Sequence, residues 1–364
     1  MSAEELAEIS QKLQGGTMRA AVYRGPGQVS VERVPIPEVG DGEMLVRIYA
    51  CGVCGTDLKK IEHGLVPPPR VFGHEMAGVV AKAGKGVTKF KVGDRVVAHH
   101  HVPCGACFYC RRRLFSQCEF YRRTGTTAGF EPAGGGFAEF IRVMDWIVDA
   151  GVVRIPDHAS YEEASFLEPL NTCLRAVDIA EVLPGEVVVI YGQGPVGLMM
   201  MQAAAVEGAR VVGLDFIDAR LDVARELGAA AAFNPQRDDV KAEIAKLTEG
   251  RGADLAIVAA ANPQAVGEAQ KITRRGGRVM LFAQTVPGEQ IPVDAGAICM
   301  EEKKLIGSYS ASVDRQDKAA ELVFSGKVDV KRLISHRLPL ESLMEGIGIA
   351  LHPTDQSLKV VIQP

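Results

Sequence analysis

A glycine-rich segment in the middle of the chain is the feature that most restricts its fold. The apolar run Val187–Tyr191 leads directly into Gly192-Gln-Gly194-Pro-Val-Gly197, and a helix-like pattern follows. A strand that turns into a helix through the G-x-G-x-x-G spacing is typical of a βαβ unit that binds a dinucleotide. This part of the chain is therefore predicted to belong to the α/β class.

The residues of this segment have separate physical roles. Gly192 permits the tight turn, Gly194 lets the backbone approach a pyrophosphate, and Gly197 lets helix and strand pack closely. Pro195 and Val196 stand at the start of the helix, where free N–H groups and the helix dipole favour the negative phosphates. We expect the cofactor's phosphates at this helix N-terminus.

An acidic residue follows the next strand-like run. Asp215 comes 23 residues after Gly192, where a carboxylate can accept hydrogen bonds from both ribose hydroxyls and would repel a 2′-phosphate. Arg220 is close in sequence and could soften that preference. NAD is the predicted cofactor, with NADP as the less favoured alternative.

Strand-like and helix-like runs alternate after Pro169. The expected strands are Val187–Tyr191, Arg210–Leu214, Ala231–Phe233, Asp254–Ala259, Arg278–Phe282 and Lys304–Ser308. Six strands with helical crossovers indicate a doubly wound parallel sheet of the Rossmann type. Residues 18–147 instead show short β-type runs separated by glycine, proline and charge, which predict an irregular, mostly antiparallel β domain.

Composition argues against several classes of function. The 41 basic and 45 acidic residues nearly cancel, and no basic run suggests nucleic acid or an anionic membrane as a partner.

The segment Met1–Thr17 is polar and amphipathic, so it is expected as a short helix or disordered arm rather than a secretory signal. Without an apolar run of membrane-spanning length, the expected location is the cytoplasm.

Six of the eight cysteines fall between residues 51 and 118. Cys104, Cys107, Cys110 and Cys118 form C-x2-C-x2-C-x7-C, and four thiolates at such spacing can close a tetrahedral structural zinc site. An iron–sulfur cluster is the competing metal hypothesis, and free buried thiols are the alternative without metal. Structural zinc is favoured, because nothing else in the sequence suggests electron transfer.

A second constellation combines Cys51-Gly-Val-Cys54-Gly-Thr56-Asp57 with Gly73-His74-Glu75. With these motifs, the four-cysteine lobe and the dinucleotide segment in this order, the chain resembles the zinc-containing medium-chain dehydrogenases of the alcohol dehydrogenase superfamily. The sorbitol (polyol) and threonine dehydrogenase branch is the most similar. The resemblance covers nearly everything after the first 17 residues.

The resemblance implies a GroES-like, β-rich catalytic domain at residues 18–168, with the structural zinc lobe at 104–118. A Rossmann cofactor domain would occupy residues 169–311, and residues 312–364 would return to the catalytic domain. A homo-oligomer, either a tetramer or a dimer, is also implied.

The resemblance also assigns a catalytic zinc. Cys54 and His74 match two ligands, and Glu75 matches an acidic residue that binds the zinc directly or swings in during turnover. Glu168, 24 residues before Gly192, occupies the third ligand position, where the polyol branch replaces a cysteine with a carboxylate. Cys51 and Cys173 are interpreted as structural thiols.

The implied reaction moves a hydride between the nicotinamide and an alcohol whose oxygen the zinc polarises. Thr56 matches the hydroxyl that accepts the substrate's proton, and Asp57 would orient the ligand loop. Many relatives carry a histidine where this chain has Lys59; Lys59, His63 and water remain as alternative routes for the proton.

A small polyol or sugar-like secondary alcohol is the predicted substrate. The alternatives are a threonine-type amino alcohol and a simple secondary alcohol. A non-catalytic nucleotide-binding relative is disfavoured because the metal ligands are all present. The tract His99–His101 resembles a metal site, but neighbouring residues of a strand point to opposite faces, so ordinary packing or contact with substrate is expected instead.

Overall fold

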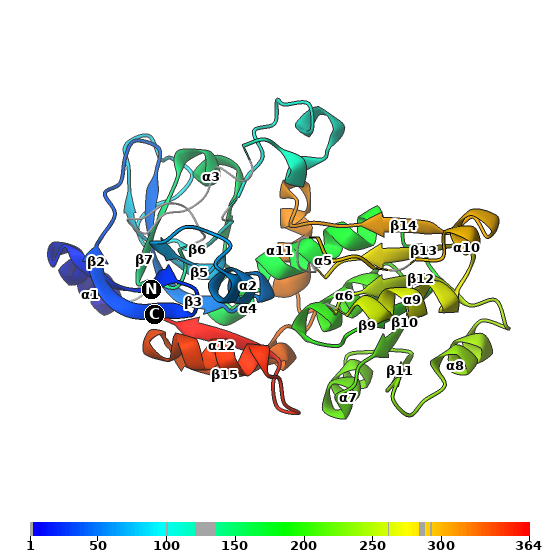
Figure 1. The fold of residues 1–364 in the computed structure, drawn as a ribbon. Coiled ribbons are helices and arrows are strands. Elements are labelled where there is room, and N and C mark those ends of the chain that lie inside the picture. Colours follow the sequence, from blue (N-terminus) through cyan, green and yellow to red (C-terminus); the bar gives the residue numbers. More distant parts are fainter. Residues whose placement is uncertain (1–2, 100, 121–134, 261, 284–287, 292) are drawn as a thin grey trace.

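The computed structural model describes residues 3–99, 101–120, 135–260, 262–283, 288–291 and 293–364. These residues form three β-sheets with helices around them, and Figure 1 shows a β-rich part beside an α/β part. The helices are α1 (Ala3–Gln14), α2 (Gly55–His63), α3 (Asp145–Ala150), α4 (Tyr161–Ser165), α5 (Leu167–Ile179), α6 (Pro195–Val206), α7 (Asp218–Glu226), α8 (Val240–Leu247), α9 (Pro263–Ile272), α10 (Ala295–Met300), α11 (Gln316–Phe324) and α12 (Leu343–Leu351).

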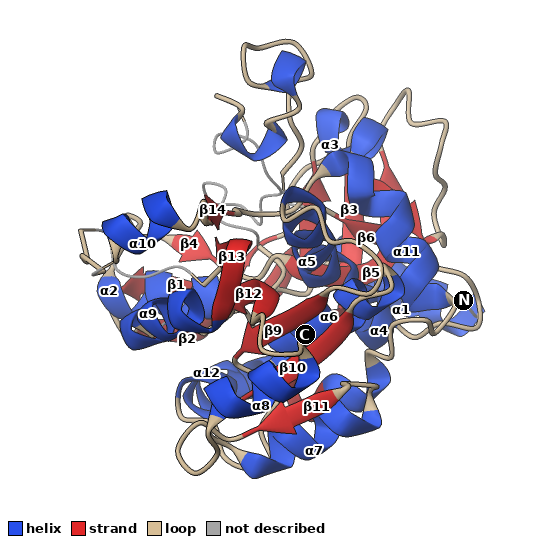
Figure 2. Cartoon of the chain, turned by 90° about the vertical axis from the view of Figure 1, so that its right-hand side faces the viewer, coloured by secondary structure: helices blue, strands red, loops and turns tan. Residues whose placement is uncertain are grey.

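The α/β part contains a six-stranded sheet in the order β11-β10-β9-β12-β13-β14, with every neighbouring pair parallel. Its strands are β9 (Val187–Tyr191), β10 (Arg210–Leu214), β11 (Ala231–Phe233), β12 (Ala253–Val258), β13 (Thr273–Leu281) and β14 (Lys304–Gly307). This order is that of a doubly wound dinucleotide-binding sheet. All six predicted strands are present. Their ends lie within one or two residues of the predicted ends, except at the start of β13. Figure 2 shows β9, β12 and β13 side by side.

Strand β9 illustrates why a continuous apolar run forms a strand here. Val188 and Ile190 pack into the core that also contains α5 and α6, while Val187, Val189 and Tyr191 pack on the opposite face of the sheet. Because helices cover both faces, every position of the strand is buried and no polar alternation is needed.

The β-rich part contains two sheets, ordered β2-β1-β4 and β15-β16-β3-β5-β6-β8, with β7 also paired to β3. Their strands are β1 (Thr17–Gly25), β2 (Gln28–Pro35), β3 (Met44–Gly52), β4 (Arg70–Val71), β5 (Glu75–Ala83), β6 (Arg95–Ala98), β7 (Phe140–Val143), β8 (Val152–Arg154), β15 (Ile334–Pro339) and β16 (Lys359–Gln363). All pairs are antiparallel except β15 with β16. The predicted mostly antiparallel domain is therefore present.

The C-terminal strand joins the N-terminal part of the chain. In β16, Val361 pairs with Gly52 of β3, and the Val53 amide donates to the Val360 carbonyl over 2.9 Å. The division into residues 18–168, 169–311 and 312–364 stays a prediction; helix α5 runs through the expected boundary between the first two.

The N-terminal segment forms helix α1, one of the two expected possibilities. Ile9 is buried in the core of the β-rich part, and the Lys12 ammonium donates to the Glu139 carboxylate over 2.8 Å. Glu139 also accepts from the Arg19 amide over 2.8 Å. The helix thus packs onto the core instead of lying outside it.

Glu139 should make stability depend on pH. Burial acts to raise its pKa, but the bonds from Lys12 and Arg19 lower the pKa to about 2 from an ordinary 4.5. A lowered folded-state pKa contributes stability above pH 4.5, and this is lost as pH falls toward 2. We expect Glu139→Gln to cost roughly 1–3 kcal/mol at pH 7 in urea unfolding, with a smaller difference at pH 3. The exposed Glu345→Gln is the control; an equal loss at both pH values would contradict this account.

No helix among the described residues is both long and apolar enough to cross a membrane.

Candidate functional site

Three predicted metal ligands meet where β3, α2 and β5 join. Cys54 is the N-cap residue of α2, His74 precedes β5, and Glu75 is the first residue of β5. One ligand atom from each lies within 4.8 Å of the other two. Residues 20 positions apart in sequence converge because β3 and β5 pair antiparallel, with Gly52 opposite Glu75.

A tight turn places His74. Gly73 adopts φ +90°, a conformation that favours glycine, and a Cβ there would lie 2.8 Å from Cys51 Sγ. Cys51 itself is fully buried and lies outside the ligand cluster among the described residues, in keeping with a structural thiol.

The negative groups around His74 would stabilise a bound cation. His74 Nδ1 lies 3.3 Å from an oxygen of the buried Asp57, and the ring also interacts with Cys54, so the imidazole is oriented within the ligand cluster. Burial lowers the pKa of His74, yet negative Asp57 and Cys54 raise it well above its ordinary value. A thiolate, an imidazole oriented by a carboxylate, and a second carboxylate form a donor set that fits zinc.

Glu168 faces the same cluster from the first turn of α5. It is buried, and burial raises its pKa to about 7, with His74 lowering it and Glu75 raising it further. Among the described residues it is not within 4.8 Å of all three other ligand atoms, so direct binding to the same metal stays a prediction. A divalent cation nearby would favour its charged form.

Lys359 is a site residue that the sequence did not indicate. It begins β16, its side chain is 4% exposed, and its ammonium pairs with Glu75 Oε2. In sequence it resembles an ordinary lysine at the solvated end of an apolar strand, and no local pattern marks it.

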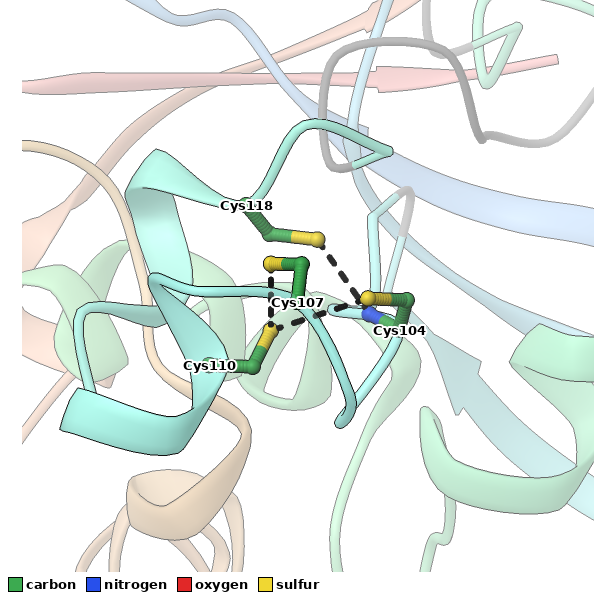
Figure 3. A group of neighbouring side chains, drawn as sticks. All are labelled: Cys104, Cys107, Cys110 and Cys118. Carbon is green, nitrogen blue, oxygen red and sulfur yellow. Dashed lines mark hydrogen bonds between the residues drawn. The ribbon is translucent and has the colours of Figure 1, made fainter.

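The four-cysteine lobe brings all four sulfur atoms together, as Figure 3 shows. Cys107 Sγ lies 3.5 Å from Cys110 Sγ, and Cys104 Sγ lies 3.9 Å from Cys110 Sγ. A zinc–sulfur bond of about 2.3 Å in a tetrahedron requires sulfur separations of about 3.8 Å. A backbone bond from Cys110 lowers the pKa of the Cys107 thiol to about 6, which favours the thiolate that metals bind. The lobe therefore fits a closed metal site.

The glycine-rich turn has the geometry that its spacing predicts. Gly192 adopts φ +94°, and a Cβ on Gly197 would lie 1.8 Å from the Gly192 carbonyl oxygen. Gly194 is the N-cap residue of α6, Pro195 is its first residue, and Val196 follows. The positive φ and the close approach explain why glycine is needed at these two positions.

Asp215 and Arg220 lie beside this turn. The Asp215 carboxylate accepts from the Gln193 amide over 2.6 Å and from the Ile217 amide over 2.9 Å. Arg220 Nη1 lies 3.8 Å from Asp215 Oδ2. The same Nη1 atom would lie 3.7 Å from a Cβ built on Gly194. Gln193, which no sequence motif marks as a functional residue, also donates from its side-chain amide to the Ile190 carbonyl over 2.9 Å and so holds the turn.

The remaining candidate residues differ in how exposed they are and in whether they interact with the cluster of candidate metal ligands. Thr56 is half-buried in the first turn of α2. Burial lowers the pKa of Lys59, while Cys54 raises it, so its ammonium lies within electrostatic range of the cluster. His63 is exposed, 3.9 Å from Glu62. Cys173 is fully buried, with its Sγ 3.6 Å from the Val196 carbonyl, as a structural thiol would be.

The histidine tract contributes the buried His99 and the half-buried His101. Burial lowers the pKa of His99 to about 4 and that of His101 to about 3, with His74 among the further causes for His101. His100 lies outside the described residues. Neither His99 nor His101 belongs to a metal-like cluster among the described residues.

Two stretches of the chain match known families. Residues 40–157 match the alcohol dehydrogenase GroES-like domain, and residues 195–325 match zinc-binding dehydrogenase. The chain is 33% identical to sorbitol dehydrogenase of Bacillus subtilis (strain 168), over 95% of this chain and 97% of that protein. It is 37% identical to an alcohol dehydrogenase of Geobacillus stearothermophilus, over 90% of this chain and 94% of that protein. Among solved structures, a zinc-binding dehydrogenase of Sinorhizobium meliloti 1021 bound to NADP matches this fold with a TM-score of 0.86. The two chains are 30% identical, and the match covers 96% of this chain and 99% of that one.

Proposed function

The chain belongs to the zinc-containing medium-chain dehydrogenases of the alcohol dehydrogenase superfamily, and on that premise we propose that it moves a hydride between NAD and a small polyol or sugar-like secondary alcohol. Its class, an oxidoreductase acting on alcohols or polyols, follows from the family matches. The observation that carries the proposal is the convergence of Cys54, His74 and Glu75 within 4.8 Å.

Two metals and one dinucleotide complete the proposed enzyme. Cys54 and His74, with Glu168 and Glu75 beside them, would hold a catalytic zinc, and the four cysteines of the lobe would hold a structural one. The zinc, when bound, would lower the pKa of an alcohol oxygen, and the nicotinamide would accept the hydride. Every other step falls to side chains of this chain.

Those side chains have distinct tasks. Asp57 fixes the tautomer and orientation of His74 through the 3.3 Å contact with Nδ1. The Thr56 hydroxyl would accept the substrate's proton. Lys59 is the group proposed to pass that proton on: its neutral amine, which burial favours by lowering its pKa, would accept the proton and release it to water, whereas His63 is exposed beside Glu62.

The polyol assignment rests on the carboxylate at position 168. A buried glutamate beside the metal cluster offers a hydrogen-bond acceptor that a cysteine would not, and such an acceptor suits a substrate with several hydroxyls. The sorbitol dehydrogenase relative supports this class. A homo-oligomeric state and a cytoplasmic location stay predictions.

A substrate panel tests the function. We would measure NAD and NADP reduction by the zinc-loaded protein with polyols, cyclitols, threonine and simple secondary alcohols. Turnover of polyols with NAD is expected. Threonine as the best substrate would support the amino-alcohol alternative, and preference for a simple alcohol would overturn the polyol assignment. If no compound of the panel is oxidised although zinc and NAD are both bound, the proposed substrate class is wrong.

The cofactor preference is tested at Asp215. Its carboxylate would repel a 2′-phosphate, so wild type should prefer NAD. Asp215→Asn, which keeps the shape but removes the charge, is expected to raise the NADP-to-NAD ratio of kcat/KM by roughly 10–100-fold. Arg220→Ala should lower that ratio, since it removes the cation beside the turn. A wild-type preference for NADP would contradict the assignment.

A further inference from the structure

A cavity of about 680 Å³ lies between α8, α9, α10 and the start of β13. At this end of the sheet, Ala253 of β12 pairs with Thr273 of β13. At the other end of β12, Val258 pairs with Tyr191, the residue before the glycine turn. Five residues of extended strand span about 16 Å, so the cavity lies at the opposite end of the sheet from the glycine turn. Figure 1 shows α8, α9 and α10 away from the β-rich part.

Positive charge lines this cavity. Six of its lining residues are basic and two are acidic, in a chain whose net charge is −4. The basic residues come from several segments of the chain: Lys241, Arg251, Lys271, Arg274, Arg275 and Lys303. Arg274 pairs with Asp254 over 2.6 Å and Lys303 pairs with Glu301 over 2.7 Å, so these two are held in place. A concave surface lined mainly by one sign of charge attracts ions of the opposite sign.

The other four cations are open to a ligand. Lys241 and Arg275 are exposed, and neither forms an ion pair within the part of the chain that the structure describes. Arg251 and Lys271 pair with carboxylates that are themselves exposed, and such surface pairs are weak. An anion in the cavity could therefore bind the first two directly and compete for the others.

Gln270 lines the same cavity and has an unused hydrogen-bond donor. It is 7% exposed, and its side-chain oxygen accepts from the Asp294 amide over 3.3 Å. Its Nε2 is buried and has no acceptor among the described residues. Leaving a buried donor without an acceptor is costly. An anionic oxygen in the cavity, reached by a small rotation of the amide, would supply that acceptor.

We propose that this cavity binds a small polyphosphate anion, either an inorganic one or the phosphate chain of a nucleotide. Its volume of about 680 Å³ lies within the range of small-molecule sites and exceeds what one phosphate group fills. Because the cations come from separate segments, linked phosphates can pair with more of them than one phosphate can. The site is separate from the glycine turn, and the inference does not depend on the proposed substrate.

The test measures binding of inorganic triphosphate and of ATP to the full chain by calorimetry, with NAD saturating so that the glycine turn is occupied. Both probes should bind wild type. Replacing Lys241 and Arg275 together by glutamine should weaken that binding by roughly tenfold or more, because two charged contacts are lost. ATP binding more tightly than triphosphate would identify a nucleotide as the natural source, and equal affinities would indicate an inorganic polyphosphate.

Two further variants separate this site from general charge attraction. The double variant Arg33→Gln with Lys91→Gln removes the same charge from exposed positions outside the cavity, and should keep wild-type affinity. Gln270→Glu keeps the oxygen that accepts from the Asp294 amide but replaces the donor with an anionic oxygen, so binding should weaken by roughly tenfold or more. Tm shows whether each variant is folded.

Hydrogen exchange locates the bound anion. Triphosphate should slow exchange in residues 240–252 and 267–275, which carry most of the cations. Protection confined to residues 192–197 would place the anion at the glycine turn and overturn the inference. So would an equal loss of affinity in both double variants, or the absence of binding to wild type at concentrations up to roughly 1 mM. Triphosphate binding that depends on Lys241 and Arg275 would support the inference even if no alcohol is oxidised.

Discussion

Replacing Cys54 with serine is expected to lower kcat by roughly a thousandfold or more and to reduce bound zinc from about two to about one per chain. Cys54 lies with His74 and Glu75 in the set of ligand atoms within 4.8 Å. A neutral hydroxyl is a far poorer zinc ligand than a thiolate, and metal polarisation of the substrate is worth several kcal/mol of transition-state stabilisation. Steady-state kinetics and metal analysis of the same preparation measure both effects.

Two other cysteines provide matched controls. Cys51→Ala changes a buried thiol three residues away that lies outside the ligand cluster, and Cys299→Ser changes an exposed one. Both should keep about two zinc ions; the exposed variant should also keep wild-type kcat. Retention of two zinc ions and normal turnover by Cys54→Ser would remove Cys54 from the catalytic site.

The second large effect is expected in the four-cysteine lobe. Cys110→Ser should lose about one zinc ion and roughly 3–5 kcal/mol of unfolding free energy, because metal binding at a closed site is coupled to folding. Cys110 is buried between its neighbours, 3.5 Å from Cys107 Sγ and 3.9 Å from Cys104 Sγ. Without the metal, little apolar packing remains to order this lobe: its apolar cluster contains only the buried Cys110 and Cys118, with Cys107 and Phe115 partly buried against them.

Limited proteolysis reports on the lobe directly. Arg111, Arg112 and Arg113 are exposed on it and offer trypsin sites that the folded lobe should protect. Cleavage there should be much faster in Cys110→Ser than in wild type or in Cys173→Ala, whose buried thiol lies outside the lobe. Wild-type zinc content together with unchanged cleavage would show that no structural metal depends on Cys110.

The sequence by itself determined most of the parallel sheet and indicated most of the candidate metal ligands. Strands such as Val187–Tyr191 could be recognised because their apolar runs are bounded by turn residues, and both are local features. The glycine turn and the four-cysteine spacing are also local, since their chemistry depends on residues within one loop. Cys54, His74 and Glu75 were found through a family resemblance, and the structure then placed them together.

Only the tertiary structure decided which distant residues meet. Lys359 reaches Glu75 because β16 pairs with β3, and Lys12 reaches Glu139 because α1 packs on the β-rich core. Neither lysine differs in its local sequence from a solvated one. A pattern of residues records which side of an element is buried, but not which other element covers it. The partner that makes a charge structural or functional is therefore set by long-range pairing, which no short motif encodes.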